Sequence, residues 1–186
     1  MSSHFARIAY TPSVKAMQRR YVGREAAFGS GQDVPKLGVR EREFIALRDS
    51  FYLATVSEDG WPHVQHRGGP AGFLKVLAAD SLAFADCGGN QQMVSVGNLS
   101  ANPRAALILM DYPKRRRLKI LGEVTVMEAG AADASLLEAV LETGGPPAER
   151  IMLIRVAAFD WNCSKFITPR FTESEWQANG LPLANC

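Results

Sequence analysis

The sequence predicts an antiparallel β-barrel, a mainly β fold with flanking helices. Short runs of β-branched and aromatic residues recur between positions 51 and 159, and such runs are typical of strands. Most of them follow one another at hairpin spacing, which implies antiparallel pairing. Six or seven strands in so few residues favour a closed or nearly closed barrel, because closure removes exposed strand edges.

Turn residues separate the expected strands. Asp59-Gly60 is a strong hairpin signal between the first two runs. Gly68-Gly69-Pro70 ends the second run, because proline lacks the N–H group that a strand ladder needs. The expected strands cover residues 51–56, 63–67, 73–77, 82–86, 105–111, 118–127 and 151–159.

Helical periodicity replaces strand periodicity in a few places. From Asn90 onward, Met93, Val96, Gly97 and Ser100 follow the i, i+3, i+4, i+7 spacing of a helix, and Pro103 stops this helix. Further helices are expected over residues 13–21, 40–50 and 131–142, and Thr172 with Glu175 predicts a capped C-terminal helix.

The chain reads as one domain with short additions. We expect an N-terminal extension over residues 1–39, partly helical, a barrel domain over 40–171, and a short C-terminal segment over 172–186. At 186 residues, with 47% hydrophobic and 22% charged residues, the chain can bury a sizeable core. No internal repeat interrupts it.

Charge and cysteine content limit the class of protein. A net charge of +2 is too small to imply nucleic-acid binding by itself. The three cysteines are odd in number and form no CxxC motif, so we expect no disulfide framework and a cytoplasmic location. No signal peptide and no membrane span is read from the apolar runs.

The histidines do not predict a metal site. His63 and His66 form an HxxH spacing, but an offset of three on a strand places the two side chains on opposite faces. We therefore expect two half-exposed strand histidines. Catalytic Ser/His/Asp or Cys/His groupings, Walker A and GxGxxG patterns do not occur.

The basic run at residues 114–117 has three interpretations: a nucleic-acid patch, the solvated start of a strand, or part of an anion site. Other donors favour the third. Arg67 and Lys75 stand on neighbouring strands, and Gly88-Gly89-Asn90 opens a helix whose N-terminus attracts phosphate. Gln91 and Gln92 would add side-chain donors in the first turn.

Each of two residues after the last strand has a structural and a functional interpretation. Trp161 could stack on a planar ligand or plug the end of the barrel, and the sequence favours the plug. Cys163 could be a reactive thiol, but no histidine lies near it in sequence, which favours a small packed residue.

Four segments in order resemble the pyridoxamine 5'-phosphate oxidase-like flavin-binding family, in its branch of predicted flavin-nucleotide-binding proteins. They are ATVSEDGWPHVQHRGGPAGFLKV, LAFADCGGNQQMVSVGNLSANPRAAL, MDYPKRRRLKILGEV and FDWNCSKFITPRF. The resemblance implies a Greek-key split β-barrel, also called an FMN-binding split barrel. It also implies a homodimer with flavin mononucleotide (FMN) in clefts between the subunits.

The resemblance also implies cofactor-binding residues. They are Arg67, Lys75, Asn90, Gln91, Gln92, Ser95, Arg117 and Trp161, with Asn162 beside the last of them. Gln91 stands where the branch often has an arginine, so a neutral amide replaces an ionic hydrogen bond to phosphate. Arg67, Lys75 or Arg115 could compensate. The C-terminal signature of true pyridoxamine phosphate oxidases is not visible, so vitamin B6 oxidation is not expected.

The function that this resemblance implies is an FMN-dependent oxidoreductase acting on a small molecule. The flavin would carry the electrons, and Arg117 and Lys75 would stabilise its reduced, anionic form. No catalytic acid or base stands out. The alternative is a non-catalytic module that binds or senses flavin, haem or another cofactor. Nucleic-acid binding through residues 114–117 is a third, weaker hypothesis.

Overall fold

A single antiparallel sheet of seven strands forms the body of the protein. The computed structural model describes residues 2–27, 36–89, 91–142, 144–161 and 164–178. The strand order in the sheet is β2-β1-β5-β6-β7-β4-β3, and each neighbouring pair is antiparallel. The strands are β1 (Ser50–Val56), β2 (Pro62–Gly68), β3 (Lys75–Ala78), β4 (Ser81–Cys87), β5 (Arg104–Asp111), β6 (Arg116–Glu128) and β7 (Ala148–Trp161).

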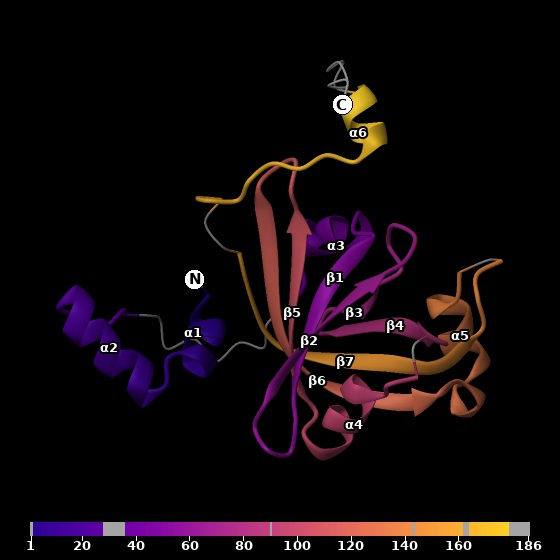
Figure 1. Cartoon of the computed structure of the whole chain (residues 1–186), viewed down its shortest axis with the longest axis horizontal. Helices are drawn as coiled ribbons and strands as arrows, with labels where there is room; N and C mark the ends of the chain where they lie inside the picture. Colours follow the sequence, from indigo (N-terminus) through magenta and orange to yellow (C-terminus); the bar gives the residue numbers. More distant parts are fainter. Residues whose placement is uncertain (1, 28–35, 90, 143, 162–163, 179–186) are drawn as a thin grey trace.

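Short helices lie around this sheet, as Figure 1 shows. They are α1 (Ser3–Ala9), α2 (Pro12–Val22), α3 (Val39–Ala46), α4 (Val94–Ala101), the 3₁₀ turn η1 (Ala129–Ala131), α5 (Ala134–Val140) and α6 (Glu173–Ala178). Thr172 and Glu175 form the expected reciprocal cap of α6. No described helix combines the length and the apolar character that crossing a bilayer requires. The expected mainly β, antiparallel split barrel with flanking helices is confirmed.

Several elements differ from the sequence prediction: helix α1 was not expected, and the helix expected over 40–50 ends at Ala46. The third strand begins at Lys75 rather than at Phe73, because Phe73 closes a turn with its N–H on the carbonyl of Pro70. The helix expected from position 90 begins at Val94, because Gln91 and Met93 have φ values of 59° and 53° that a right-handed helix excludes. The helix predicted over 131–142 is divided between η1 and α5.

The core fills the concave side of the curled sheet. Alternate residues of the central strands point inward, so that Phe51, Leu107 and Leu118 are buried while their chain neighbours are more exposed. Phe51 stacks on Phe73 and meets Phe84 edge to face, with ring centroids 5.5 and 5.3 Å apart. This aromatic cluster packs under the strands that carry the site.

The N-terminal helices differ in how they contact the sheet. Helix α1 is fixed on β7, because the backbone N–H of Ser2 donates to Asp160 at 2.8 Å and the Ser2 hydroxyl donates to the carbonyl of Phe159 at 2.6 Å. Phe5 is buried beneath it. Helix α2 has no buried residue and projects away from the strands in Figure 1.

A glycine permits the sharp pairing of β6 with β7. The register of these two strands shifts between Leu121 and Gly122, as expected at a β-bulge. A Cβ atom at Gly122 would lie 2.7 Å from the carbonyl oxygen of Arg155 and 2.9 Å from Cγ2 of Ile154. Since one of these neighbours is backbone, the strand itself would have to move.

Gly122→Ala should therefore destabilise the fold by about 1–3 kcal/mol through overpacking. The free energy of unfolding, measured by urea titration, checks this. Gly97→Ala is the matched control, because a Cβ at Gly97 in α4 meets nothing within 4 Å. This control should be neutral or slightly stabilising, since alanine favours helix more than glycine does. Equal stability of the two variants would contradict the packing argument.

Candidate functional site

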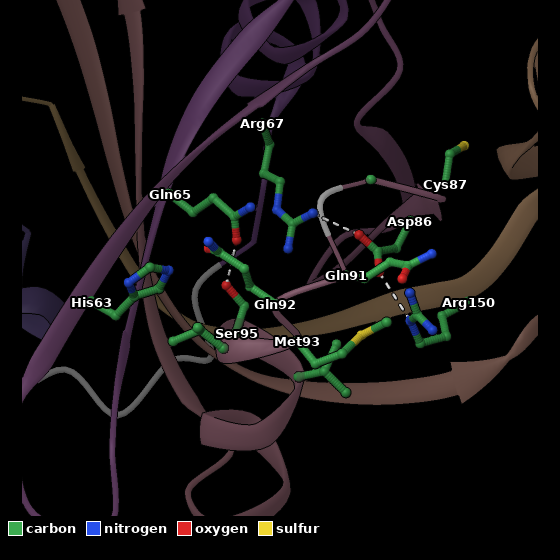
Figure 2. Close-up of a pocket in the computed structure, with 13 residues that line it drawn as sticks. His63, Gln65, Arg67, Asp86, Cys87, Gln91, Gln92, Met93, Ser95 and Arg150 are labelled. Atoms are coloured by element: carbon green, nitrogen blue, oxygen red, sulfur yellow. Dashed lines mark hydrogen bonds and ion pairs between the residues drawn. The ribbon is translucent and has the colours of Figure 1, made fainter.

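A cavity of about 270 Å³ opens where β2 and β4 diverge next to the N-terminus of α4. Figure 2 shows side chains from all three elements converging on it. Residues from four separate parts of the sequence contribute to its lining. They are His63, Gln65, Arg67, Asp86, Cys87, Gly89, Gln91, Gln92, Met93, Val94, Ser95, Val96 and Arg150.

Strand β2 contributes alternate residues to the cavity. His63, Gln65 and Arg67 are each half-buried, whereas His66 between them is exposed on the other face. Two-residue periodicity on a strand produces this arrangement. It confirms that His63 and His66 lie on opposite faces. No group of three or more potential metal-ligating side chains occurs within the described parts of the chain.

A buried carboxylate links the two sides of the cavity. Asp86 is only 5% exposed. Its Oδ1 accepts a hydrogen bond of 2.6 Å from Arg67, and its Oδ2 accepts one of 3.0 Å from Nε of Arg150. Both arginine side chains are largely buried. Two cations thus share one carboxylate at the cavity wall, which offsets the cost of burying the charge.

Helix α4 directs its N-terminus at the same cavity. Its N-cap residue, Met93, adopts a left-handed conformation and makes no side-chain capping bond. The first backbone N–H groups of the helix therefore have no side-chain acceptor at the cap position, and the positive end of the helix dipole faces the cavity. Ser95 in the first turn donates to the side-chain oxygen of Gln65 at 2.8 Å, which joins α4 to β2.

A second cavity, of about 370 Å³, lies beyond the Arg67–Asp86 pair. It is lined by residues 68–70 at the end of β2 and by 140–142 at the end of α5. Arg67, Asp86 and Cys87 line both cavities. The ion pair therefore stands between two adjoining spaces.

The structure brings together four of the predicted cofactor residues. Arg67, Gln91, Gln92 and Ser95 line the first cavity. Gln91 and Gln92 precede the helix instead of forming its first turn, which corrects the sequence prediction. Asn90, Asn162 and Cys163 lie outside the described residues.

The other three predicted cofactor residues lie apart from this cavity. Lys75 forms an ion pair of 2.5 Å with Glu142, which lines the second cavity. Arg117 lies on the outer face of β6, opposite Met110 of β5. Trp161 packs edge-on against Phe44, and its indole N–H donates to Glu41 at 2.7 Å. Trp161 therefore packs as the sequence favoured, and its role toward a cofactor stays a prediction.

The basic run at residues 114–117 spans the end of the β5–β6 turn and the first two residues of β6. Asp111 accepts hydrogen bonds from the guanidinium of Arg116 at 2.8 Å and from the backbone N–H of Lys114 at 3.0 Å. Burial alone would raise the pKa of Asp111, but these bonds and the nearby charge of Arg48 hold that pKa below its ordinary value. Part of the run thus serves to hold the turn.

Pattern-based reasoning overlooked Asp86 and Arg150, which hold the cavity together. A signal for Asp86 was present, because it continues the inward-facing series of Leu82 and Phe84 with a charge. A charge on the buried face of a strand requires a partner. Nothing in the sequence, however, identified Arg150 as that partner, since sixty-four residues separate the two.

The family of the chain follows from a comparison of its sequence with models of known families. The model described as pyridoxamine 5'-phosphate oxidase matches residues 40–162. The chain belongs to this family. No curated protein matches the sequence. The match begins at the start of α3 and ends at the end of β7, so that the whole barrel lies within it and α1 and α2 lie outside it.

Solved structures share the fold of this pyridoxamine 5'-phosphate oxidase family member at low sequence identity. A putative pyridoxamine 5'-phosphate oxidase from Lactobacillus delbrueckii is 20% identical, with a TM-score of 0.53, and covers 69% of this chain and 97% of its own. HupZ of Group A Streptococcus is 14% identical, with a TM-score of 0.52, and covers 66% of this chain and 90% of its own.

A charge-removing substitution tests the importance of the buried carboxylate in this family member. Asp86→Ala should lower the free energy of unfolding by about 3 kcal/mol, because it leaves the buried Arg67 without its carboxylate partner and leaves Arg150 with Glu149 alone. Chemical denaturation measures this. Glu123→Ala is the control, since it removes an exposed ion pair with Arg155 and should cost about 1 kcal/mol or less. Similar losses in the two variants would contradict the structural role of Asp86.

The thiol of Cys87 has an altered acidity that can be measured. Burial, followed by the negative charges of Asp86 and Glu149, raises the pKa of this thiol. Because the thiolate is the nucleophile, Cys87 should react slowly with iodoacetamide at pH 7, and its rate should still increase above about pH 8.5. Mass spectrometry of the Cys87 peptide, with glutathione as the reference thiol, checks this. A rate that is already constant at pH 7 would contradict it.

Proposed function

We propose that the protein binds FMN at the cavity between β2, β4 and α4 and works as a flavin-dependent oxidoreductase on a small molecule. One observation carries the proposal: Arg67, Arg150 and the uncapped N-terminus of α4 converge on a single cavity. Cationic side chains and helix N-termini are the groups that hold phosphate in proteins. The family of the chain supports the choice of a flavin nucleotide.

The residues present fit the phosphate end of such a cofactor. Nε of Arg67 is buried and has no hydrogen-bond partner among the described residues. The Arg67 side chain lines the cavity while its Nη1 holds Asp86, so the same guanidinium would face the proposed phosphate. Arg150 supplies a second guanidinium at the cavity wall. It would take the phosphate-binding role of the arginine that Gln91 replaces. Ser95 lines the cavity in the first turn of α4, where its hydroxyl donates to Gln65 and fixes that amide at the cavity wall.

Bound FMN would supply the electron transfer, and the chain would supply binding, orientation and electrostatics. Positive charges near the flavin ring would stabilise its reduced, anionic form. Lys75 and Arg117 are the residues that we propose for this role. Arg117 lies on the outer face of the sheet, so its contribution requires the cavity of a second subunit.

The outer face of the sheet supports a homodimer. Strands β1, β5 and β6 present Ala54, Ala106 and Leu121 there, around a shallow space of about 540 Å³. Tyr52 is exposed on the same face. An apolar sheet face of this kind is typical of a protein interface. We propose that the second subunit covers it and brings Arg117 toward the cofactor.

The alternative is a non-catalytic cofactor-binding module, for which haem is the candidate that a specific observation favours. The imidazole of His63 lines the cavity, and histidine is a common axial ligand of haem iron. The same barrel would then store or sense its cofactor.

The absorption spectrum of the purified protein distinguishes these functions. A flavin spectrum, with FMN released on denaturation, is the expected result, and reduction by a nicotinamide donor followed by transfer to an acceptor would identify an enzyme. A Soret band lost in His63→Ala would identify the haem module instead. A colourless protein that takes up neither added cofactor would contradict both.

Arg67→Ala should weaken FMN binding about ten- to a hundredfold, because a hydrogen bond between a charged donor and phosphate contributes about 1.5–3 kcal/mol. Quenching of flavin fluorescence measures the dissociation constant. Lys75→Ala should also lower flavin retention. Arg155→Ala, an exposed arginine of β7 outside both cavities, is the control. Unchanged FMN content in Arg67→Ala, with a normal melting temperature, would show that the assignment of Arg67 is wrong.

A further inference from the structure

Helix α2 carries an apolar stripe that its own subunit leaves exposed. Val14, Met17 and Tyr21 recur at the spacing of one helical face, and Tyr21 is 74% exposed. Lys15 and Arg20 flank this stripe, and the helix contains no acidic residue. Figure 1 shows α2 projecting beyond α1, away from the strands.

The β1–β2 hairpin presents exposed apolar residues beside acidic ones, and this surface is complementary to the apolar stripe and the basic residues of α2. Trp61 is 77% exposed, and Val64 on the outward side of β2 is also exposed. Glu58 and Asp59 form the tip, and residues 50–62 include no lysine or arginine. Hydrogen bonds hold the tip: the backbone N–H of Ser57 donates to the carbonyl of Trp61 at 2.9 Å, and the Ser57 hydroxyl accepts the N–H of Trp61 at 3.0 Å.

The same apolar surface connects the base of the helical arm and the hairpin. Ile8 of α1 lines the outer space on the sheet, and so do Val56 and Pro62 at the end of the hairpin. This surface is the one that we propose as the homodimer interface. A second copy seated there lies between the arm and the hairpin of the first.

We propose that α2 of each subunit docks on the β1–β2 hairpin of the other subunit. The apolar stripe would cover Trp61 and Val64, and Lys15 and Arg20 would face Glu58 and Asp59. A two-fold axis forms both contacts at once, because an isologous interface uses each surface twice. The proposal rests on the homodimer of the proposed function and adds an exchanged arm that lies outside the residues matched by the family model.

A second copy fits this arm better than a lipid surface does. Basic amphipathic helices can also lie on anionic membranes, but those helices insert large apolar residues along much of their length. Helix α2 has 11 residues and contributes mainly Val14, Met17 and Tyr21 to its apolar side. The chain itself supplies an exposed tryptophan next to two carboxylates, which matches both the stripe and its charges.

Substitutions in the arm test the contact through the dimer dissociation constant, measured by analytical ultracentrifugation on the full chain. Met17→Asp should raise this constant about tenfold or more, because each dimer contains the contact twice. Ala16→Asp is the matched control, since it places the same charge on the same helix at a position that helical periodicity puts on the side away from the stripe. It should leave the constant unchanged. No effect of Met17→Asp would overturn the proposal.

Charge reversal tests the pairing of the two surfaces. Lys15→Glu with Arg20→Glu should weaken the dimer, and so should Glu58→Lys with Asp59→Lys. The chain that carries all four changes should recover the wild-type constant to within about threefold, because each surface then meets its complement again. Failure of this recovery would overturn the proposed pairing.

Two further measurements separate this inference from the proposed function. FMN content is measured in the same samples, so a wild-type monomer that holds FMN would overturn the arm exchange while the cofactor assignment stands. Conversely, a wild-type dimer that holds no flavin and is weakened by Met17→Asp would support the arm exchange and contradict the cofactor assignment. Binding of the wild type, but not of Met17→Asp, to phosphatidylserine vesicles with no change in dimerisation would assign the arm to a membrane surface and overturn the proposal.

Discussion

The Asp86 carboxylate, held between Arg67 and Arg150, connects parts of the sheet that backbone pairing leaves apart. Strand β2 is an edge of the sheet, whereas β4 lies next to the opposite edge. Arg150 reaches Asp86 across a paired strand, but Arg67 reaches it across the gap between β2 and β4. Strands β2 and β4 are thus joined by an ion pair between side chains rather than by backbone hydrogen bonds.

This contact also determines the chemistry of the cavity. Two guanidiniums line the cavity beside Asp86, and Arg150 also pairs with the more exposed Glu149 at 2.7 Å. The N-terminus of α4 adds partial positive charge from the other side. The proposed phosphate group would add a charge-assisted acceptor for these donors. The side chains that close the sheet are therefore the ones that we propose for ligand binding.

The barrel and the N-terminal arm have different relations to the rest of the molecule. The barrel buries its own core and contains the cavity, and it is the part that the family model covers. Helix α2 buries nothing within its subunit. An exposed apolar stripe is unfavourable in water, so a second surface that covers it would add to the stability of the helix.

The sequence by itself determined the strands, the hairpin at Asp59-Gly60 and the opposite faces of His63 and His66, because period-two alternation and turn chemistry are local properties. It also indicated Arg67 and Ser95 for the cavity. Only the tertiary structure decided that Asp86 and Arg150 belong to that cavity, and that Lys75 and Arg117 lie outside its lining. Contacts across a curled sheet depend on how far it closes, and that closure is set by packing between residues distant in sequence.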